Sequence, residues 1–381
     1  MPRRSVAATA RGNHAPARRD PLSGVSLWPK ALLLSCTVLL AGCAGEIAAG
    51  PRSAEPGSAS QGVPFGRTSA DGVTPVPTLA ESVPPQPPQP PQPRLPLTIA
   101  AVGDIMLDRS VAEAITPEHP EGPFAHVLDV LQIADLTVGN LESAVSDLGQ
   151  AGQKSYTFRA PPLAAAGLAA AGFDLVSIAN NHSLDFGPEA LVDTAERLRA
   201  ASVEVVGGGR DNEEAYRYRV LTAHGVRVAF LGLAEVPNDY GYDRSLWTAA
   251  PGKPGIAWVD EERMAATIHE AAETAEVVVV MFHFGVEGAS EPSERQRQLS
   301  RSAIDAGAKL VLGSHPHVLQ KIEDYGGGLI AYSLGNFVFD GFEGDANKSG
   351  ILLVSFAADG SLSWRMEPVS IGWDGLPRPR E

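Results

Sequence analysis

The sequence predicts an α/β sandwich with largely buried strands in residues 97–373. Short apolar runs alternate there with Ala- and Glu-rich segments of helical length, which is typical of sheets covered by helices. After Ser349 the pattern changes to two alternating runs around Asp359-Gly360, which indicates a C-terminal β-hairpin. Residues 374–381 are expected to form a tail.

The expected strands are seven apolar runs. In chain order they are LTIAAVGDIML (97–107), DLTVGNLES (135–143), FDLVSIANNH (173–182), RVAFLGLAEV (227–236), EVVVVMFHFG (276–285), KLVLGSHPH (309–317) and GLIAYSLGNFVF (328–339). Four segments between them are expected to be helices, because each opens with a proline or an aspartate, as helix N-termini often do. These segments are residues 161–171, 188–201, 260–274 and 292–306.

Residues 1–42 are expected to be a secretory signal. Six Lys and Arg side chains precede the apolar run ALLLSCTVLLAGC (31–43). Because this run is too short to cross a bilayer, it indicates a signal segment rather than a membrane span. Its last four residues, LAGC, resemble a bacterial lipobox, which implies cleavage before Cys43, diacylation of that cysteine and anchoring at the outer face of the cytoplasmic membrane. A secreted protein without lipid and an uncut signal anchor are the alternatives.

Residues 43–96 are expected to be a disordered Pro-rich linker. They consist largely of Gly, Ser, Ala and Pro and end in PPQPPQPPQPRLP. Such a segment buries too little apolar surface to offset its ordering, and its polyproline II tendency makes it a stiff spacer. A recognition role for the tract is the alternative. Cys36 is the one other cysteine and lies in the signal, so no disulfide is expected.

The charge of the chain excludes some classes of partner. Removing the six basic residues and one acidic residue of the signal lowers the formal net charge from −15 to about −20. Such an acidic surface argues against binding of nucleic acid and against passive adsorption to anionic lipid. It fits a protein that handles cations or one that is kept soluble outside the cell.

The apolar runs end on residues that bind metal ions or exchange protons. These are Asp104, Asn140, Glu142, Asn180, Asn181, His182, His283, His315, His317 and Asn336. In open α/β sheets ligands bind beyond the carboxyl ends of the strands, so these loops can converge on one site. Each residue alone has a structural explanation, such as a helix cap, a left-handed turn or a buried core histidine. Taken together they favour one chemical cluster.

Carboxylate, amide and imidazole groups without a thiolate suit divalent Mn, Fe, Zn or Mg. A carboxylate such as Glu142 can bridge two ions, and such a pair can activate water. His182, beside a candidate ligand, suits a general acid for the leaving group. In the sequence His315-Pro316-His317 the proline stiffens the turn, so the two imidazoles can be directed onto neighbouring ions.

Six sequence blocks resemble the CapA family of bacterial capsule synthesis proteins, named for poly-γ-glutamate capsule formation. The blocks are GDIMLDR, GNLES, ANNHSLDFG, HFGVE, GSHPHVLQ and YSLGNFVFD, and the resemblance covers residues 97–345. This family is similar in turn to calcineurin-like metallophosphoesterases. The resemblance therefore implies a four-layer α/β/β/α sandwich of the metallophosphoesterase type for the domain at residues 97–373.

The resemblance also implies roles for single residues in a site with one or two divalent ions. Asp104 and His317 would bind the first ion and Glu142 would bridge, whereas Asn181, His283 and His315 would bind the second ion and His182 would donate a proton. Two departures matter. Met106 stands where phosphoesterases have a histidine, and Glu142 replaces the usual Asp. Metal binding is thus expected, and phosphatase activity is not implied.

Other residues near these blocks have more than one interpretation. Arg109 and Arg159 can meet an anionic substrate, since guanidinium pairs with carboxylate or phosphate, although a surface salt bridge is the alternative for Arg159. Asp185 either orients His182 or closes a turn, and Glu287 is either an acid of the site or the end of a loop. Asn140 and Asn336 are expected to support the metal ligands.

Three functions remain open from the sequence. The first is a lipid-anchored component of poly-γ-glutamate or related polymer synthesis, export or anchoring, with the anionic polymer, the membrane and the membrane proteins of a polymer synthase as partners. The second is an extracytoplasmic metal-dependent phosphoesterase or amide hydrolase unrelated to capsule. The third is a polymer-binding protein without turnover.

Overall fold

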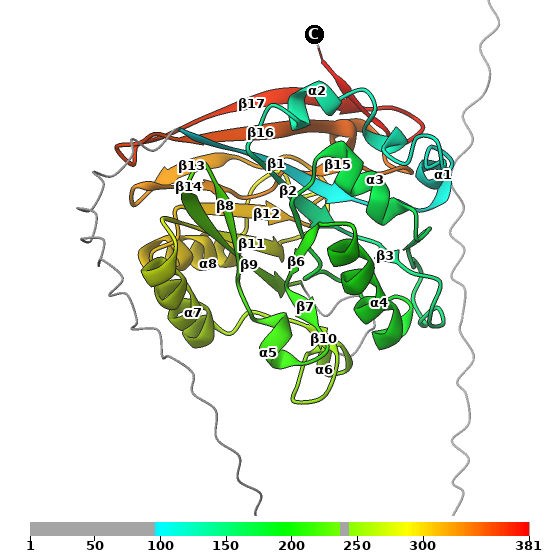
Figure 1. Ribbon diagram of the computed structural model, residues 1–381, viewed down its shortest axis with the longest axis horizontal. Coiled ribbons are helices and arrows are strands. Elements are labelled where there is room, and N and C mark those ends of the chain that lie inside the picture. Colours follow the sequence, from blue (N-terminus) through cyan, green and yellow to red (C-terminus); the bar gives the residue numbers. More distant parts are fainter. Residues whose placement is uncertain (1–95, 237–243, 381) are drawn as a thin grey trace, which may run out of the picture. The chain divides into compact units, whose positions relative to one another are not determined.

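The computed structural model describes residues 96–236 and 244–380 (Figure 1). The expected signal segment, the expected lipid attachment site at Cys43 and nearly all of the expected linker lie outside the described residues. In the described ranges, none of the helices has the length and apolarity needed to cross a membrane.

The first of two large sheets has the strand order β18-β17-β16-β1-β2-β5-β6, and β15 also pairs with β1. Its strands are β1 (Leu97–Ile105), β2 (Leu136–Leu141), β5 (Leu175–Ser177), β6 (Glu204–Val206), β15 (Asn336–Val338), β16 (Lys348–Phe356), β17 (Leu362–Ile371) and β18 (Pro377–Pro379). Strands β1, β2, β5 and β6 are parallel, whereas β16 pairs antiparallel with β1 and forms a hairpin with β17.

The second sheet has the strand order β13-β14-β12-β11-β9-β8. Its strands are β8 (Arg219–Ala223), β9 (Val226–Glu235), β11 (Val277–Phe284), β12 (Leu310–Ser314), β13 (Ile322–Tyr325) and β14 (Gly328–Ala331). The four central strands are parallel and the two edge strands are antiparallel. Two small sheets pair β3 (Ala144–Val145) with β4 (Arg159–Ala160) and β7 (Gly208–Gly209) with β10 (Gly255–Ile256).

Four longer helices cover the sheets, α3 and α4 over the first and α7 and α8 over the second (Figure 1). They are α3 (Ala164–Ala171), α4 (Gly187–Ala200), α7 (Glu261–Thr274) and α8 (Glu294–Asp305). Local signals start two of them, because Asp260 caps α7 and Ser293 forms a capping box with Gln296 on α8. The short elements are α1 (Arg109–Ala112), η1 (Gly122–Phe124), α2 (Leu128–Leu131), α5 (Asn212–Ala215), α6 (Arg244–Trp247) and η3 (Gly344–Asn347).

The two sheets pack face to face. Alternate residues of each strand point to opposite sides, so one set of side chains faces the other sheet and the other set faces the helices. In β11, Val279 and Met281 enter the core between the sheets, whereas Val280 and Phe282 pack against the helices. The same alternation in β1 places Ile99 between the sheets. The predicted four-layer α/β/β/α sandwich is therefore confirmed, as is the C-terminal hairpin.

Two of the differences from the expected elements concern residues 328–339 and the expected tail. The apolar run at residues 328–339 is two strands, because β14 belongs to the second sheet and β15 pairs with β1 of the first. The expected tail at residues 374–381 contains β18, which pairs antiparallel with β17. The first sheet thus extends past residue 373. The sequence did not predict this strand, because β18 is a polar edge strand without the apolar run by which the other strands are recognised.

Candidate metal centre

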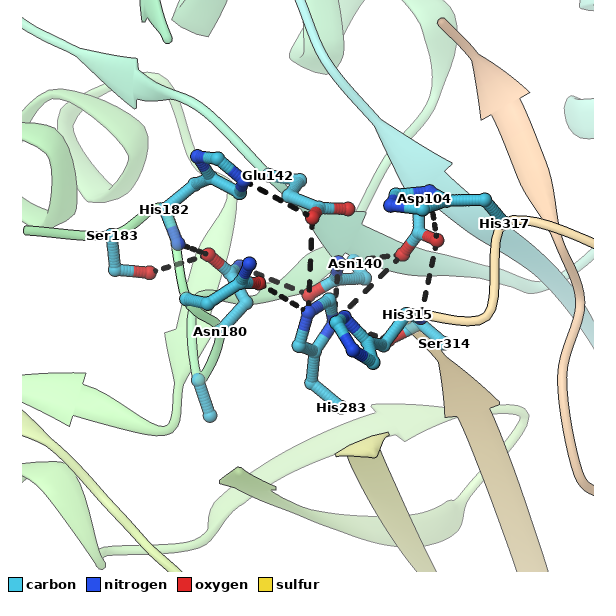
Figure 2. A network of polar contacts seen from close by, with 12 residues as sticks. Asp104, Asn140, Glu142, Asn180, His182, Ser183, His283, Ser314, His315 and His317 are labelled. Atoms are coloured by element: carbon cyan, nitrogen blue, oxygen red, sulfur yellow. Dashed lines mark hydrogen bonds and ion pairs between the residues drawn. The ribbon is translucent and has the colours of Figure 1, made fainter. Parts of the chain in front are cut away.

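The polar residues at the strand ends converge where the carboxyl ends of strands from both sheets meet (Figure 2). Asp104 and Asn140 lie on β1 and β2, and His283 lies on β11 of the other sheet. The remaining members follow a strand or begin one, and all of them are buried: Glu142, Asn180, Asn181, His182, His315, His317 and Asn336. Figure 2 shows Glu142 and Asn140 between His182 on one side and Asp104 with His317 on the other.

A β-bulge directs Asp104 into this cluster. Ala101 pairs with Val138, but the next pair is Asp104 with Asn140, so β1 contains one residue more than β2 in this stretch. Strict alternation would put Asp104 on the opposite face from Ala101, whereas the extra residue returns it to the face between the sheets. Asn140 Nδ2 then donates to Asp104 Oδ1 at 2.8 Å.

The loop after β12 carries His315 and His317 in a strained backbone conformation. Their φ angles are 96° and 58°, a region that residues other than glycine rarely adopt. The backbone N–H of His315 donates to Asp104 Oδ2 at 3.2 Å, and His317 Nδ1 donates to Asn336 Oδ1 at 2.8 Å. Contacts to β1 and β15 therefore hold both imidazoles in the cluster.

His283 presents one nitrogen to the cluster because Ser314 contacts the other. Ser314 Oγ donates to the Phe282 carbonyl and lies 2.9 Å from His283 Nδ1, and Asn140 Nδ2 lies 3.3 Å from the same nitrogen. The other ring nitrogen, Nε2, lies inside the cluster, 2.7 Å from Asn181 Oδ1.

Other atoms of the cluster lack hydrogen-bond partners although they are fully buried. Among the described residues these include both carboxylate oxygens of Glu142 and both ring nitrogens of His315. Leaving such groups buried and unpaired costs free energy, whereas coordination to a cation satisfies them. The donor set thus fits a divalent metal, with oxygen and nitrogen ligands and no thiolate.

Two groups of side chains have ligand atoms that all lie within 4.8 Å of one another. One is Asp104, Glu142 and His283, and the other is Glu142, His315 and His317. Glu142 belongs to both groups, as a bridging carboxylate would. The partition differs from the one implied by the resemblance, since His283 groups with Asp104 and His315 groups with His317.

Burial determines the protonation of most of these groups. It lowers the pKa of His315 to about 3 and that of His182 to about 4, and it lowers the pKa of His283 as well. These imidazoles are therefore neutral at pH 7, the form that binds metal. Burial, and then the charge of Asp104, raises the pKa of Glu142.

His182 lies at the side of the cluster, and Asp185 and Phe158 fix the position of its ring. Its Nδ1 donates to Asp185 Oδ2 at 2.7 Å, and the Phe158 ring packs on it with centroids 4.2 Å apart. Nε2 points toward Glu142, 3.9 Å from Oε1. Asp185 Oδ2 also accepts from the backbone N–H of Phe158. Because this carboxylate holds the His182 ring, Asp185 does not merely close a turn.

The two arginines differ in position. Arg109 is partly exposed, is ion-paired with Asp340, and lies over the rings of Phe158 at 4.9 Å and Phe339 at 5.9 Å. Those rings pack on His182 and His317 respectively, so Arg109 lies one ring away from the cluster.

Arg159 is directed elsewhere. Its guanidinium lies 3.6 Å from the Phe186 ring centroid and donates to the carbonyls of Leu148 and Gly149. The side chain therefore holds a loop through carbonyl groups rather than through the salt bridge considered as its alternative. Glu287 is exposed, and its charge acts on Glu142 in the same direction as Asp104.

Sequence reasoning missed two residues of the site. Lys154, in a loop between β3 and β4, donates from Nζ to Asp185 Oδ1 at 2.6 Å. It follows no apolar run, so no strand-end signal identifies it. Ser314 does end such a run, directly before His315, and that position was the available signal.

Comparisons with known proteins agree on one family. Residues 98–341 match the family described as Bacterial capsule synthesis protein PGA_cap. The chain is 32% identical over 287 residues to the PGA biosynthesis protein CapA of Bacillus subtilis (strain 168), covering 74% of this chain and 73% of that protein. It is 31% identical over 291 residues to the Capsule biosynthesis protein CapA of Bacillus anthracis, covering 74% and 69%.

A solved structure with a similar chain path is a hypothetical protein from Thermus thermophilus. The match has a TM-score of 0.47 and 16% sequence identity, and it covers 71% of this chain and 99% of that chain.

Proposed function

Since the chain belongs to the PGA_cap family of bacterial capsule synthesis proteins, we propose that it acts in the synthesis, export or anchoring of poly-γ-glutamate or a related anionic polymer. The names of its relatives, PGA biosynthesis protein and capsule biosynthesis protein, support this role. We propose further that a divalent-metal centre cleaves or transfers the polymer.

One observation carries the catalytic part of the proposal. Glu142 and His315 are fully buried with no hydrogen-bond partner for any of their four ligand atoms among the described residues. A protein that only required a packed core would have apolar residues there, because burying unpaired polar groups is unfavourable. A metal ion is the simplest group that satisfies carboxylate and imidazole together.

The ligands of one or two ions would be Asp104, Glu142, Asn181, His283, His315 and His317. When bound, the metal would supply an activated water and a Lewis acid for the carbonyl or phosphoryl oxygen. The donor set suits Mn, Fe, Zn or Mg.

Proton exchange is assigned to His182. The ring is neutral at pH 7, and its one proton is on Nδ1, which donates to Asp185. Nε2 is therefore the atom that takes up a proton and returns it to the leaving group. Arg109 would hold a carboxylate of the polymer at the edge of the site, in exchange for Asp340.

The remaining parts of the proposal concern the location of the domain. Cys43 would carry the lipid anchor at the outer face of the cytoplasmic membrane, and residues 43–96 would be the spacer that leads to the folded domain. Membrane proteins of a polymer synthase would be its partners. Mass determination of the chain from membranes, before and after lipase treatment, tests the anchor.

A polymer-binding protein without turnover is the second candidate. The observation in its favour is Met106, which stands where phosphoesterases have a histidine and accepts from the backbone N–H of Asp108 through its sulfur at 3.1 Å. The first ion therefore has one imidazole fewer.

Incubation of the purified chain with poly-γ-glutamate tests both candidates. Polymer length is followed by size-exclusion chromatography with Mn, Fe, Zn or Mg added singly, beside a chelator control and His182→Asn. Metal-dependent shortening that His182→Asn abolishes supports hydrolysis. Binding without shortening supports the second candidate, and neither binding nor shortening contradicts the polymer role.

A further inference from the structure

Lys154 is a buried lysine beside the metal centre to which the proposed function assigns no role. It lies between β3 and β4, and its side chain is 9% exposed. Its ammonium lies 5.0 Å from the ring centroid of Trp247, which is itself buried. A lysine seldom occupies such a position unless the buried charge has a specific partner.

One such partner is the carboxylate that holds His182. Lys154 Nζ donates to Asp185 Oδ1 at 2.6 Å and to the carbonyl of Asn181 at 2.5 Å. The other carboxylate oxygen, Oδ2, accepts from His182 Nδ1 at 2.7 Å and from the N–H of Phe158 at 2.8 Å. The two oxygens of Asp185 thus serve different partners, Lys154 on one and His182 on the other.

The backbone keeps the lysine in this place. The N–H of Gly152 donates to the Asp185 carbonyl at 2.7 Å, and the N–H of Lys154 donates to the Gly152 carbonyl at 2.9 Å. The loop is therefore fastened to Asp185 by main chain as well as by side chain.

The geometry of these contacts fixes which nitrogen of His182 carries the proton. A carboxylate oxygen accepts, so the 2.7 Å contact of Asp185 Oδ2 with Nδ1 requires a proton on Nδ1, and the Lys154 ammonium 3.4 Å away does not bond to that nitrogen in this tautomer. The ammonium holds Asp185 Oδ1, which leaves Oδ2 turned toward His182 to accept from Nδ1–H. Nε2 then keeps its lone pair, directed at Glu142.

We propose that Lys154 is a positioning residue for the reaction at the metal centre, which through Asp185 holds His182 with Nδ1 protonated and Nε2 facing the ligands. This inference rests on the proposed function, because it gives His182 its orientation for proton exchange. The Lys154 ammonium contacts Asp185 and the Asn181 carbonyl, and its charge also acts on Glu142, so the tautomer of His182 is the readout that isolates the contact through Asp185.

The test compares Lys154→Met with wild type, with Lys154→Arg as the conservative variant. Lys309→Met is the matched control, since Lys309 is exposed at the opposite end of β12 from His315. In the chelated protein, the imidazole ¹⁵N signals of His182 report the tautomer, and they are assigned by their loss in His182→Gln. Metal content and the kinetics of poly-γ-glutamate cleavage are measured in parallel.

Lys154→Met is expected to populate the Nε2-protonated form of His182 and to lower kcat about 10- to 100-fold, with KM and metal content changed less than about twofold. Lys154→Arg is expected to retain the Nδ1–H tautomer. An unchanged tautomer and kcat in a folded Lys154→Met would overturn the inference, as would loss of the tautomer in Lys154→Arg. If wild type leaves the polymer intact, the cleavage proposal fails, and the ¹⁵N signals alone decide the role of Lys154.

Discussion

The carboxylate of Glu142 and the imidazole of His283 face each other from different sheets, with Oε1 3.7 Å from Nε2. Glu142 follows β2 of the first sheet, and His283 lies on β11 of the second. The candidate metal centre therefore depends on how the two sheets pack.

Glu142→Ala should remove most of the bound metal, because Glu142 belongs to both groups of candidate ligands. Metal content is measured by ICP mass spectrometry on protein purified without a metal-affinity tag. Wild type should hold one or two equivalents, and the exposed variant Glu262→Ala on α7 should match it. Equal metal in Glu142→Ala and wild type would show that the ion lies elsewhere.

His182→Asn should leave metal content unchanged and lower polymer cleavage by about 100-fold or more, since proton exchange is worth about 10²–10⁴ in rate. The reason is that Nε2 points toward Glu142 while Nδ1 stays on Asp185. Parallel metal analysis and rate measurement check this separation. If His182→Asn lost both its metal and its cleavage rate, His182 would be a metal ligand instead.

The chelated protein should lose stability as the pH falls from about 6.5 to about 4. Burial lowers the pKa of folded His182 from the ordinary 6.5 to about 4, so in this window the unfolded chain binds a proton that the folded chain does not. Each such histidine contributes up to about 1.4 kcal/mol per pH unit. Glu142 acts oppositely, because its raised pKa gives stability that is lost as the pH rises.

Urea unfolding followed by circular dichroism at stepped pH measures this dependence. His182→Gln should show a shallower fall than wild type between these pH values, whereas His269→Gln, on the exposed side of α7, serves as the matched control. The same slope in His182→Gln and wild type would contradict the assignment.

Gly103→Ala should destabilise the domain and lower metal content together. A Cβ at Gly103 would lie 1.8 Å from the carbonyl oxygen of Gly335, where β1 meets β15. The strands must separate, which costs about 1–3 kcal/mol or more and moves Asp104 away from Asn336. Gly152→Ala is the control, because its Cβ would meet only the Asp185 carbonyl at 3.4 Å. Thermal unfolding and ICP analysis measure both effects.

Arg109→Ala should weaken poly-γ-glutamate binding about three- to tenfold, as expected for loss of a charge-assisted contact of about 1 kcal/mol. Arg159→Ala should instead lower stability with little effect on binding, because its guanidinium holds the carbonyls of Leu148 and Gly149. Calorimetric titration and thermal unfolding of both variants separate the two roles. Equal loss of affinity in both would place Arg159 at the polymer as well.

Much of the fold could be predicted from the sequence because its signals are local. The CapA resemblance is confirmed by the family match, and the helices at residues 188–201 and 260–274 appear as α4 and α7. Apolar runs identified the buried strands, whose side chains face either the other sheet or a helix. Edge strands such as β13 and β18 were missed, since a half-exposed strand needs no continuous apolar run.

The candidate site was predictable to the extent that its residues end strands. Parity along β11 carries His283 to the face between the sheets, which Met281 also occupies. No such signal identifies the positions of Lys154 and Arg159. The place of each side chain depends on a partner elsewhere in the chain. Asp185, a partner of Lys154, is 31 residues away.

The sequence by itself determined the family, the alternation of strand and helix, and the set of candidate ligand types at the strand ends. Only the tertiary structure decided that residues 328–339 pass from one sheet to the other, and that a bulge in β1 directs Asp104 toward Asn140. It also placed the candidate ligands in two groups that share Glu142. The physical reason is that periodicity records which face of a strand is buried, whereas register, bulges and contacts between sheets depend on packing across the whole domain.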